Sequence, residues 1–193
     1  MTDGTRAAGR RRIYLAGFDV FRIDAVDYGR SLQRLCARFG FEGVFPLDAS
    51  APPGLEQADL AAWICRANLA AIRAADMVMA NVADFRGVGE PDCGTAFEMG
   101  FAAALGKEIW GYRDHDRPLL RHVPSTITPA GRVCEKGYLV EDFGLPVNLM
   151  LACSARIIAG GPQACLSAIA QAWGSDSTPS PYRPTGESQI RVA

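Results

Sequence analysis

The sequence predicts a single α/β domain with a doubly wound, mostly parallel sheet of five strands. Three observations point to this class. Short apolar runs alternate with longer segments of helical periodicity, a pattern typical of parallel sheets that carry helices on both faces. The third run, residues 77–82, is almost wholly apolar, as expected of a central parallel strand. A chain of 193 residues fits one ordinary domain with a buried core.

The first half of the chain alternates strands and helices. Residues 13–17 are a short apolar strand ending in glycine, and a helix is expected over 24–39, closed by Gly40. The second strand is expected over 41–46. Apolar residues at helical spacing over 55–74 predict a long amphipathic helix before the central strand.

The second half continues the alternation with one interruption. An apolar helix over 93–106 follows the central strand, and a strand over 108–112 follows that helix. Residues 113–143 are rich in Pro, Gly and charge and are expected to form mainly loop. The remaining elements are a helix-like segment over 145–154, a strand over 157–158 and a helix over 162–173. The whole order predicts a flavodoxin-like architecture.

The expected domain covers residues 12–174. The segment 1–11 is expected to be a flexible terminus. From Gly174 onward the composition turns to Ser, Pro, Thr and Gly, so 175–193 is expected to be a disordered tail.

Charge and composition limit the classes of molecule that the protein is expected to bind. With 20 Lys and Arg against 21 Asp and Glu, the chain has no field that gathers nucleic acid or coats an anionic membrane. No apolar run reaches the roughly 20 residues of a membrane span. The six cysteines form no CxxC pair, and only two histidines occur, so free thiols are preferred to a zinc site. We expect a soluble, cytoplasmic protein that acts on a small molecule.

The most informative residue is Glu98, the only charged residue in the segment 93–106. A helix that is apolar all round is normally buried, and a buried carboxylate is costly unless it is paired or has a task. Glu98 is therefore a candidate functional group. The alternative is an ordinary solvated glutamate on a helix surface.

The expected topology places other groups near Glu98. The loops that follow the first and third strands, residues 17–24 and 83–92, lead to the same edge of a parallel sheet. Tyr14 of the first strand can therefore meet Glu98 across one crevice. Asp92 stands at the start of the Glu98 helix, where it is either an N-cap or a second acid in the pocket. The loop before it is either a surface turn or a functional loop.

Two carboxylates that face one cavity suit the chemistry of a glycosidic bond. A metal site is less plausible because the segment 93–106 supplies no third acid and no histidine. A dinucleotide site is weakly supported, because Gly87 and Gly89 have no third glycine at the required spacing.

Four segments of the chain, in order, resemble nucleoside 2-deoxyribosyltransferases. They are residues 13–21 (IYLAGFDVF), 68–76 (NLAAIRAAD), 84–100 (DFRGVGEPDCGTAFEMG) and 143–151 (FGLPVNLML). The resemblance implies exchange of the base of a 2'-deoxyribonucleoside in two steps, without cofactor or metal. Glu98 matches the nucleophile that attacks C1', Tyr14 the tyrosine that holds it ionised, and Asp92 the second carboxylate that contacts the substrate.

The resemblance also implies a substrate pocket and an assembly. Asn148 and Met150 match residues that reach into the site of a neighbouring subunit, so it implies a homo-oligomer with shared sites. By their own pattern these two would be helix and core residues. The partners implied are deoxyribonucleosides and nucleobases. The other positions that it assigns to substrate binding are Gly17, Asn68, Phe85, Arg86 and Gly94.

Two residues depart from the family pattern. Asn68 stands where another branch has an acid, and an amide cannot protonate a leaving base, so that proton must come from Asp92, water or another group. Phe18 stands where many relatives have proline.

Two alternatives stay open. One is an N-glycosidase on the same fold that hydrolyses deoxyribonucleosides or nucleoside 5'-monophosphates. Residues 18–21 hold no hydroxyl and carry an acid, which favours a free 5'-hydroxyl over a phosphate. The other is a binding protein without catalysis, which is expected to lack the nucleophile or the tyrosine.

Overall fold

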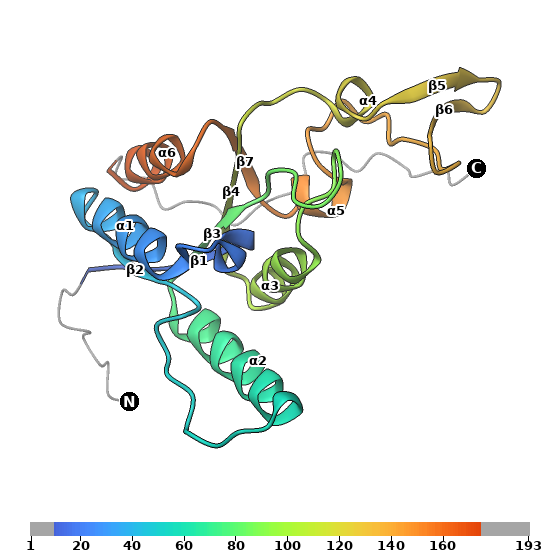
Figure 1. Ribbon diagram of the computed structural model, residues 1–193. Helices are drawn as coiled ribbons and strands as arrows, with labels where there is room; N and C mark the ends of the chain where they lie inside the picture. Colours follow the sequence, from blue (N-terminus) through green and yellow to red (C-terminus); the bar gives the residue numbers. More distant parts are fainter. Residues whose placement is uncertain (1–9, 175–193) are drawn as a thin grey trace.

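The computed structural model describes residues 10–174, and its centre is a five-stranded sheet in the order β2-β1-β3-β4-β7 (Figure 1). All four strand pairings are parallel, which confirms the predicted fold class. The order reverses between β1 and β3, the switch point at which such sheets bind ligands. The strands are β1 (Arg12–Gly17), β2 (Glu42–Val44), β3 (Met77–Asn81), β4 (Glu108–Arg113) and β7 (Arg156–Ala159).

Helices cover both faces of the sheet (Figure 1). One face carries α1 (Ala25–Arg38) and α6 (Pro162–Gly174). The other carries α2 (Gln57–Ala74), α3 (Cys93–Ala104) and α5 (Leu149–Ala152). Two apolar cores result, one on each face of the sheet.

Alternation along β1 decides which side chains meet which helices. Ile13 and Leu15 belong to the core under α1 and α6, whereas Tyr14 and Ala16 belong to the core under α2 and α3. Tyr14 shares that core with Met99 of α3. The phenol of Tyr14 is therefore on the same side of the sheet as Glu98.

The expectation of a loop over 113–143 is wrong for part of this segment. It contains a short helix, α4 (Leu119–His122), and a hairpin of β5 (Ser125–Thr128) and β6 (Gly131–Cys134). The Pro and Gly residues mark the turns of this hairpin rather than a structureless loop. Figure 1 shows the hairpin projecting from the body as an arm.

Two boundaries and one short element also differ from expectation. Only Leu149–Ala152 of the expected helix 145–154 is helical, because Pro146 has no N–H for a helix interior and Asn148 caps the helix after it. The second strand is shorter than expected. Residues Phe18–Phe21 form a 3-10 turn, η1.

The two terminal predictions lie mostly outside the described residues. Of the segment 1–11 the structure describes residues 10 and 11, and of 175–193 none. Within residues 10–174, no helix combines the length and the apolar character needed to cross a membrane.

Candidate active site

Tyr14 and Glu98 form the centre of the candidate site. The Tyr14 hydroxyl donates a hydrogen bond of 2.5 Å to Glu98 Oε1. Tyr14 is fully buried, and Glu98 is half-buried on α3. The short distance is that expected of a hydroxyl donating to an ionised carboxylate. Glu98 is thus partly buried and hydrogen-bonded to Tyr14, unlike a solvated glutamate on a helix surface.

Burial dominates the electrostatics of this pair. Desolvation raises the pKa of Glu98 to about 7, with the hydrogen bond from Tyr14 opposing the rise and the charge of Asp92 adding to it. Burial and the neighbouring Glu98 raise the pKa of Tyr14 far above its usual value. Tyr14 therefore remains a hydrogen-bond donor while Glu98 titrates near neutral pH.

Asp92 begins the helix that carries Glu98. It is 8% exposed, and its Oδ2 accepts hydrogen bonds from the Thr95 backbone N–H at 2.8 Å and the Thr95 hydroxyl at 2.9 Å. The N-cap interpretation is confirmed by this geometry. The same carboxylate is close enough to Glu98 to raise its pKa, so its structural bond and its electrostatic effect coexist.

Two glycines allow close approach around these groups. Gly17 ends β1 at a φ of +155°, and a Cβ there would lie 2.9 Å from the Asn81 Cβ. A Cβ at Gly94 would lie 3.1 Å from Asp92 Oδ2. Both positions are therefore fitted to a glycine by their neighbours.

Phe85 and Arg86 lie on the loop after β3 and contact η1. The Phe85 ring stacks on Phe18 with centroids 5.1 Å apart and on Phe21 with centroids 5.4 Å apart. The Arg86 guanidinium lies 4.5 Å from the Phe85 ring centroid. This aromatic stack joins the loops that follow β1 and β3 at one rim of the sheet.

Asn68 is half-buried on α2, the helix that packs beside α3. Within residues 10–174 its side chain has no hydrogen-bond partner. Among the described residues, no hydrogen bond joins this amide to Glu98, whose Oε1 accepts from Tyr14.

Asn148 and Met150 lie at the N-terminal end of α5. Asn148 is the N-cap of this helix: its Oδ1 accepts from the Met150 backbone N–H at 3.0 Å, and its amide donates to Glu141. Met150 is 70% exposed, so the expectation of a core residue is wrong. The hydrophobic period of a short helix does not reveal which face is outward.

A buried polar cluster at the same rim was not predicted from the sequence. Asp19 of η1 is 4% exposed, and its Oδ2 accepts from Asn81 Nδ2 at 3.0 Å and from the Tyr112 hydroxyl at 3.4 Å. Burial raises the pKa of Asp19, against the hydrogen bonds from Asn81 and Tyr112. Polar residues at the carboxyl ends of apolar strands were the signal that could have found this cluster.

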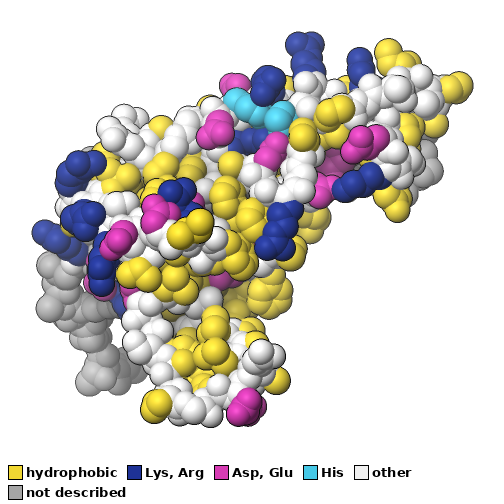
Figure 2. Space-filling model, in the orientation of Figure 1, with side chains coloured by type: hydrophobic (Ala, Val, Ile, Leu, Met, Phe, Trp, Pro, Cys, Tyr) yellow, Lys and Arg dark blue, Asp and Glu magenta, His cyan; other side chains and the backbone are white. Residues whose placement is uncertain are grey.

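A second missed cluster surrounds Asp84. Its carboxylate pairs with Arg113 and His122, and the His122 ring lies edge-on to His115 with centroids 4.5 Å apart. Figure 2 shows the two histidines together at the surface, bordered by acidic and basic groups. An arginine at the end of the apolar run in β4 was the signal in the sequence.

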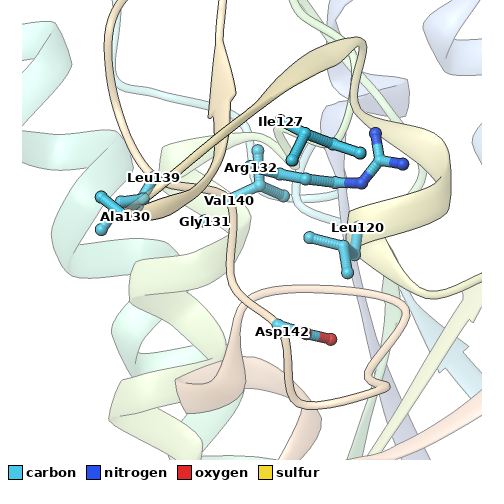
Figure 3. A pocket seen from close by; sticks show the side chains of 8 residues that line it. All are labelled: Leu120, Ile127, Ala130, Gly131, Arg132, Leu139, Val140 and Asp142. Atoms are coloured by element: carbon cyan, nitrogen blue, oxygen red, sulfur yellow. The ribbon is translucent and has the colours of Figure 1, made fainter.

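A separate cavity of about 460 Å³ lies against the arm (Figure 3). Tyr14, Asp92 and Glu98 are not among its lining residues, so it is distinct from the candidate site. It is lined by Leu120, Ile127, Ala130, Gly131, Arg132, Leu139, Val140 and Asp142.

The arrangement suits attack by a carboxylate. The Glu98 carboxylate accepts a hydrogen bond from a neutral phenol that orients it, and it lies beside a second acid, the two-carboxylate arrangement that suits attack at an anomeric carbon. Within residues 10–174, no group of three or more His, Cys, Asp or Glu side chains is placed to hold a metal ion.

Comparisons with known proteins agree with this geometry. Residues 13–150 match the family model described as nucleoside 2-deoxyribosyltransferase. The fold is similar to that of a 2-deoxyribosyltransferase from Leishmania mexicana, with a TM-score of 0.67 and 31% identity over 83% of this chain and 97% of that one.

Two further similarities are more limited. A conserved protein from Enterococcus faecalis V583 has a TM-score of 0.54 and 16% identity over 85% of this chain and 99% of that one, which shows the fold alone. An uncharacterized protein from Schizosaccharomyces pombe is 31% identical over 109 residues, or 54% of this chain. The chain thus spans about half the length, 51%, of this curated relative. Because the family model covers residues 13–150, well over half of the sequence, the chain belongs to the nucleoside 2-deoxyribosyltransferase family.

Proposed function

We propose that the protein transfers 2-deoxyribose from one nucleobase to another through a covalent deoxyribosyl ester on Glu98. The observation that carries the proposal is the 2.5 Å hydrogen bond from Tyr14 to Glu98. It holds the carboxylate of Glu98 through the hydroxyl of Tyr14, a group that cannot replace it as the nucleophile. Family membership and the similarity to the Leishmania mexicana transferase support the same activity.

The reaction has two displacement steps. In the first, a carboxylate oxygen of Glu98 forms a bond to C1' while the C1'–N bond breaks and its electron pair leaves with the base. In the second, a nitrogen of the incoming base forms a bond to C1' while the ester C1'–O bond breaks, and the proton of that nitrogen leaves by the route that protonated the first base. Two inversions return the original configuration, and Glu98 is regenerated as a carboxylate.

Proton transfer to the leaving base needs a different group from the nucleophile. Asn68 has no acidic proton to give. Asp92 already uses Oδ2 to accept two bonds from Thr95, so its other oxygen or a water molecule is the proposed route for the proton.

The exposed side chains at the N-terminal end of α5 support shared sites in a homo-oligomer. Asn148 and Met150 point away from their own core: Met150 is 70% exposed, and Asn148 is fixed by Glu141 and the α5 backbone. A neighbouring subunit is therefore the proposed receiver of both side chains, and a deoxyribonucleoside the proposed substrate.

The decisive experiment is an exchange assay. The purified protein is incubated with 2'-deoxyinosine, with and without excess adenine, and the products are separated by chromatography. Deoxyadenosine that appears only with adenine establishes transfer. Release of hypoxanthine without a new nucleoside establishes hydrolysis instead, and no reaction with purine or pyrimidine donors would overturn both.

Two variants test the assigned nucleophile. Glu98→Ala is expected to abolish exchange while the circular dichroism spectrum is kept. Glu90→Ala is the matched control, because Glu90 is an exposed acid on the loop before α3 that pairs with Lys136 at the surface, and this variant should exchange bases like the wild type.

A further inference from the structure

Arg113 is a buried charge outside the proposed chemistry. It ends β4 and is 2% exposed. Its Nη2 donates to Asp84 Oδ1 at 3.0 Å, and its Nη1 donates to the carbonyl oxygen of Pro146. Burying a guanidinium is costly unless it is paired and hydrogen-bonded. The two acceptors of Arg113 belong to two different segments of the chain.

The first segment is the loop after β3. Asp84 directly precedes Phe85 and Arg86, the two proposed substrate-binding residues on this loop. While Arg113 holds one oxygen of Asp84, His122 Nε2 lies 2.5 Å from the other. Both carboxylate oxygens are thus occupied, so the backbone at Asp84 is fixed from two sides.

Electrostatics agree with a charged Asp84. Burial raises the pKa of this carboxyl, but hydrogen bonds from His122 and the Gly89 backbone and the charges of His122 and Arg113 outweigh it, so the pKa is lowered. The ion pair with Arg113 is therefore intact at neutral pH.

The second segment leads into α5. Pro146 lies two residues before Asn148, the N-cap of that helix, and four before Met150. The bond from Arg113 to the Pro146 carbonyl fixes the chain just before it presents these two side chains. Val147, between Pro146 and Asn148, is fully buried, which holds the same stretch against the core.

We propose that Arg113 is a positioning residue that aligns the loop carrying Phe85 and Arg86 with the segment carrying Asn148 and Met150. The inference rests on the proposed function, which assigns these four side chains to substrate binding. Where sites are shared between subunits, one arginine then orders a loop of its own site and the segment offered to the neighbour's site.

The requirement is specific for arginine. A planar guanidinium donates from separate nitrogens to two acceptors in fixed directions, whereas a lysine ammonium is a single point on a flexible stem. Arg113 Nε is buried and has no hydrogen-bond partner among residues 10–174, an unfavourable feature that accompanies the two bridging bonds. Arg113→Lys keeps the charge and should lose one of the two links.

The first test does not depend on activity. Trypsin cleavage after Arg86, an exposed residue of the loop, is followed by mass spectrometry in the full-length protein. Arg113→Lys and Asp84→Asn are expected to speed this cleavage about 10-fold or more, because an unanchored loop opens locally more often. Arg121→Met is the control, since it removes an exposed arginine of α4 without touching either link.

The second test uses steady-state kinetics. In Arg113→Lys the KM for the deoxyribonucleoside is expected to rise about 10-fold, while the acid limb of the pH profile, which reports on Glu98, stays in place. A merely structural residue would lower thermal stability and leave KM unchanged. The proposal would be overturned if Arg113→Lys were cleaved after Arg86 at the wild-type rate and had the wild-type KM.

The two proposals fail in different ways. If the wild type shows no base exchange, the proposed function fails, and the rate of cleavage after Arg86 decides the positioning role by itself. If the wild type exchanges bases but Arg113→Lys matches it in both measurements, only the positioning role fails. Arg113→Met removes the bonds to both Asp84 and Pro146 and is a third variant for the same two measurements. If Arg113→Met does not fold, Arg113→Lys and Asp84→Asn are enough to test the positioning role.

Discussion

The Tyr14 hydroxyl meets Glu98 Oε1 at 2.5 Å across 84 positions of sequence. One residue lies on β1 and the other on α3, and their contact depends on the pairing of β1 with β3. The phenol opposes the effect of burial on the carboxylate. Loss of this single bond therefore changes both the orientation and the ionisation of Glu98.

The first prediction concerns Tyr14→Phe. Without the phenol, the pKa of Glu98 should rise above about 7, so the acid limb of kcat/KM should move to higher pH. A hydrogen bond to a charged group is worth about 1.5 to 3 kcal/mol, which corresponds to a loss of roughly 10- to 150-fold in rate at pH 7. A pH series of initial exchange rates measures both effects.

Tyr138→Phe provides the control for this change. Tyr138 is 72% exposed and lies next to the arm, so the same loss of a phenol there should leave the profile in place. An acid limb that stays fixed in Tyr14→Phe would contradict the electrostatic role of Tyr14.

The second prediction concerns Asp92→Asn and has the opposite sign. The charge of Asp92 contributes to the raised pKa of Glu98, so its removal should move the acid limb to lower pH. The amide oxygen can still accept from the Thr95 N–H, and stability should change little. Asp92→Ala removes the cap as well and should cost about 1 kcal/mol, measured by urea unfolding.

The third prediction concerns the stability of Glu98→Gln. The folded-state pKa of about 7 exceeds the ordinary value of 4.5. The folded protein therefore keeps a proton on Glu98 where the unfolded chain has lost it, and the wild type loses stability between pH 4.5 and 7. Above pH 7 the glutamine variant should be more stable by roughly 1 to 2 kcal/mol, after allowance for partial exposure.

Unfolding curves at two pH values check this prediction. The gain in Glu98→Gln should be present at pH 8 and should vanish near pH 4. An equal gain at both values would show that packing, and not the ionisation of Glu98, is its origin.

The fourth prediction concerns Gly17→Ala. A Cβ at this position would lie 2.9 Å from the Asn81 Cβ and 3.1 Å from Asp19 Oδ2, so the loop after β1 must shift. The expected cost is about 1 to 3 kcal/mol, with a lower melting temperature. Gly161→Ala is the control, because nothing lies within 4 Å of a Cβ there.

The sequence was sufficient for the parallel sheet and for the meeting of Tyr14 with Glu98. Both follow from periodicity and from the rule that neighbouring parallel strands end at one rim. The catalytic roles of the two residues stay predictions. Periodicity shows which elements form and at which edge of the sheet they end. That information was enough to predict that Tyr14 and Glu98 meet.

The hairpin and the Arg113 links were not predictable in the same way. The arm is built from four-residue strands, too short for a clear pattern of alternation. The contacts of Arg113 with Asp84 and Pro146 join positions 29 and 33 residues apart. Such contacts depend on how loops fold back over the sheet edge, which local sequence does not determine.

The strand order has a consequence for the making of the protein. β1 is synthesised first but lies inside the sheet, between β2 and β3. Until β3 emerges from the ribosome, the strand that carries Tyr14 has a bare edge that can pair with other chains. A nascent chain that ends before β3 thus lacks Glu98, the hydrogen-bond partner of Tyr14, and exposes an open strand edge. Slower cell growth at low temperature is therefore expected to raise the yield of folded protein.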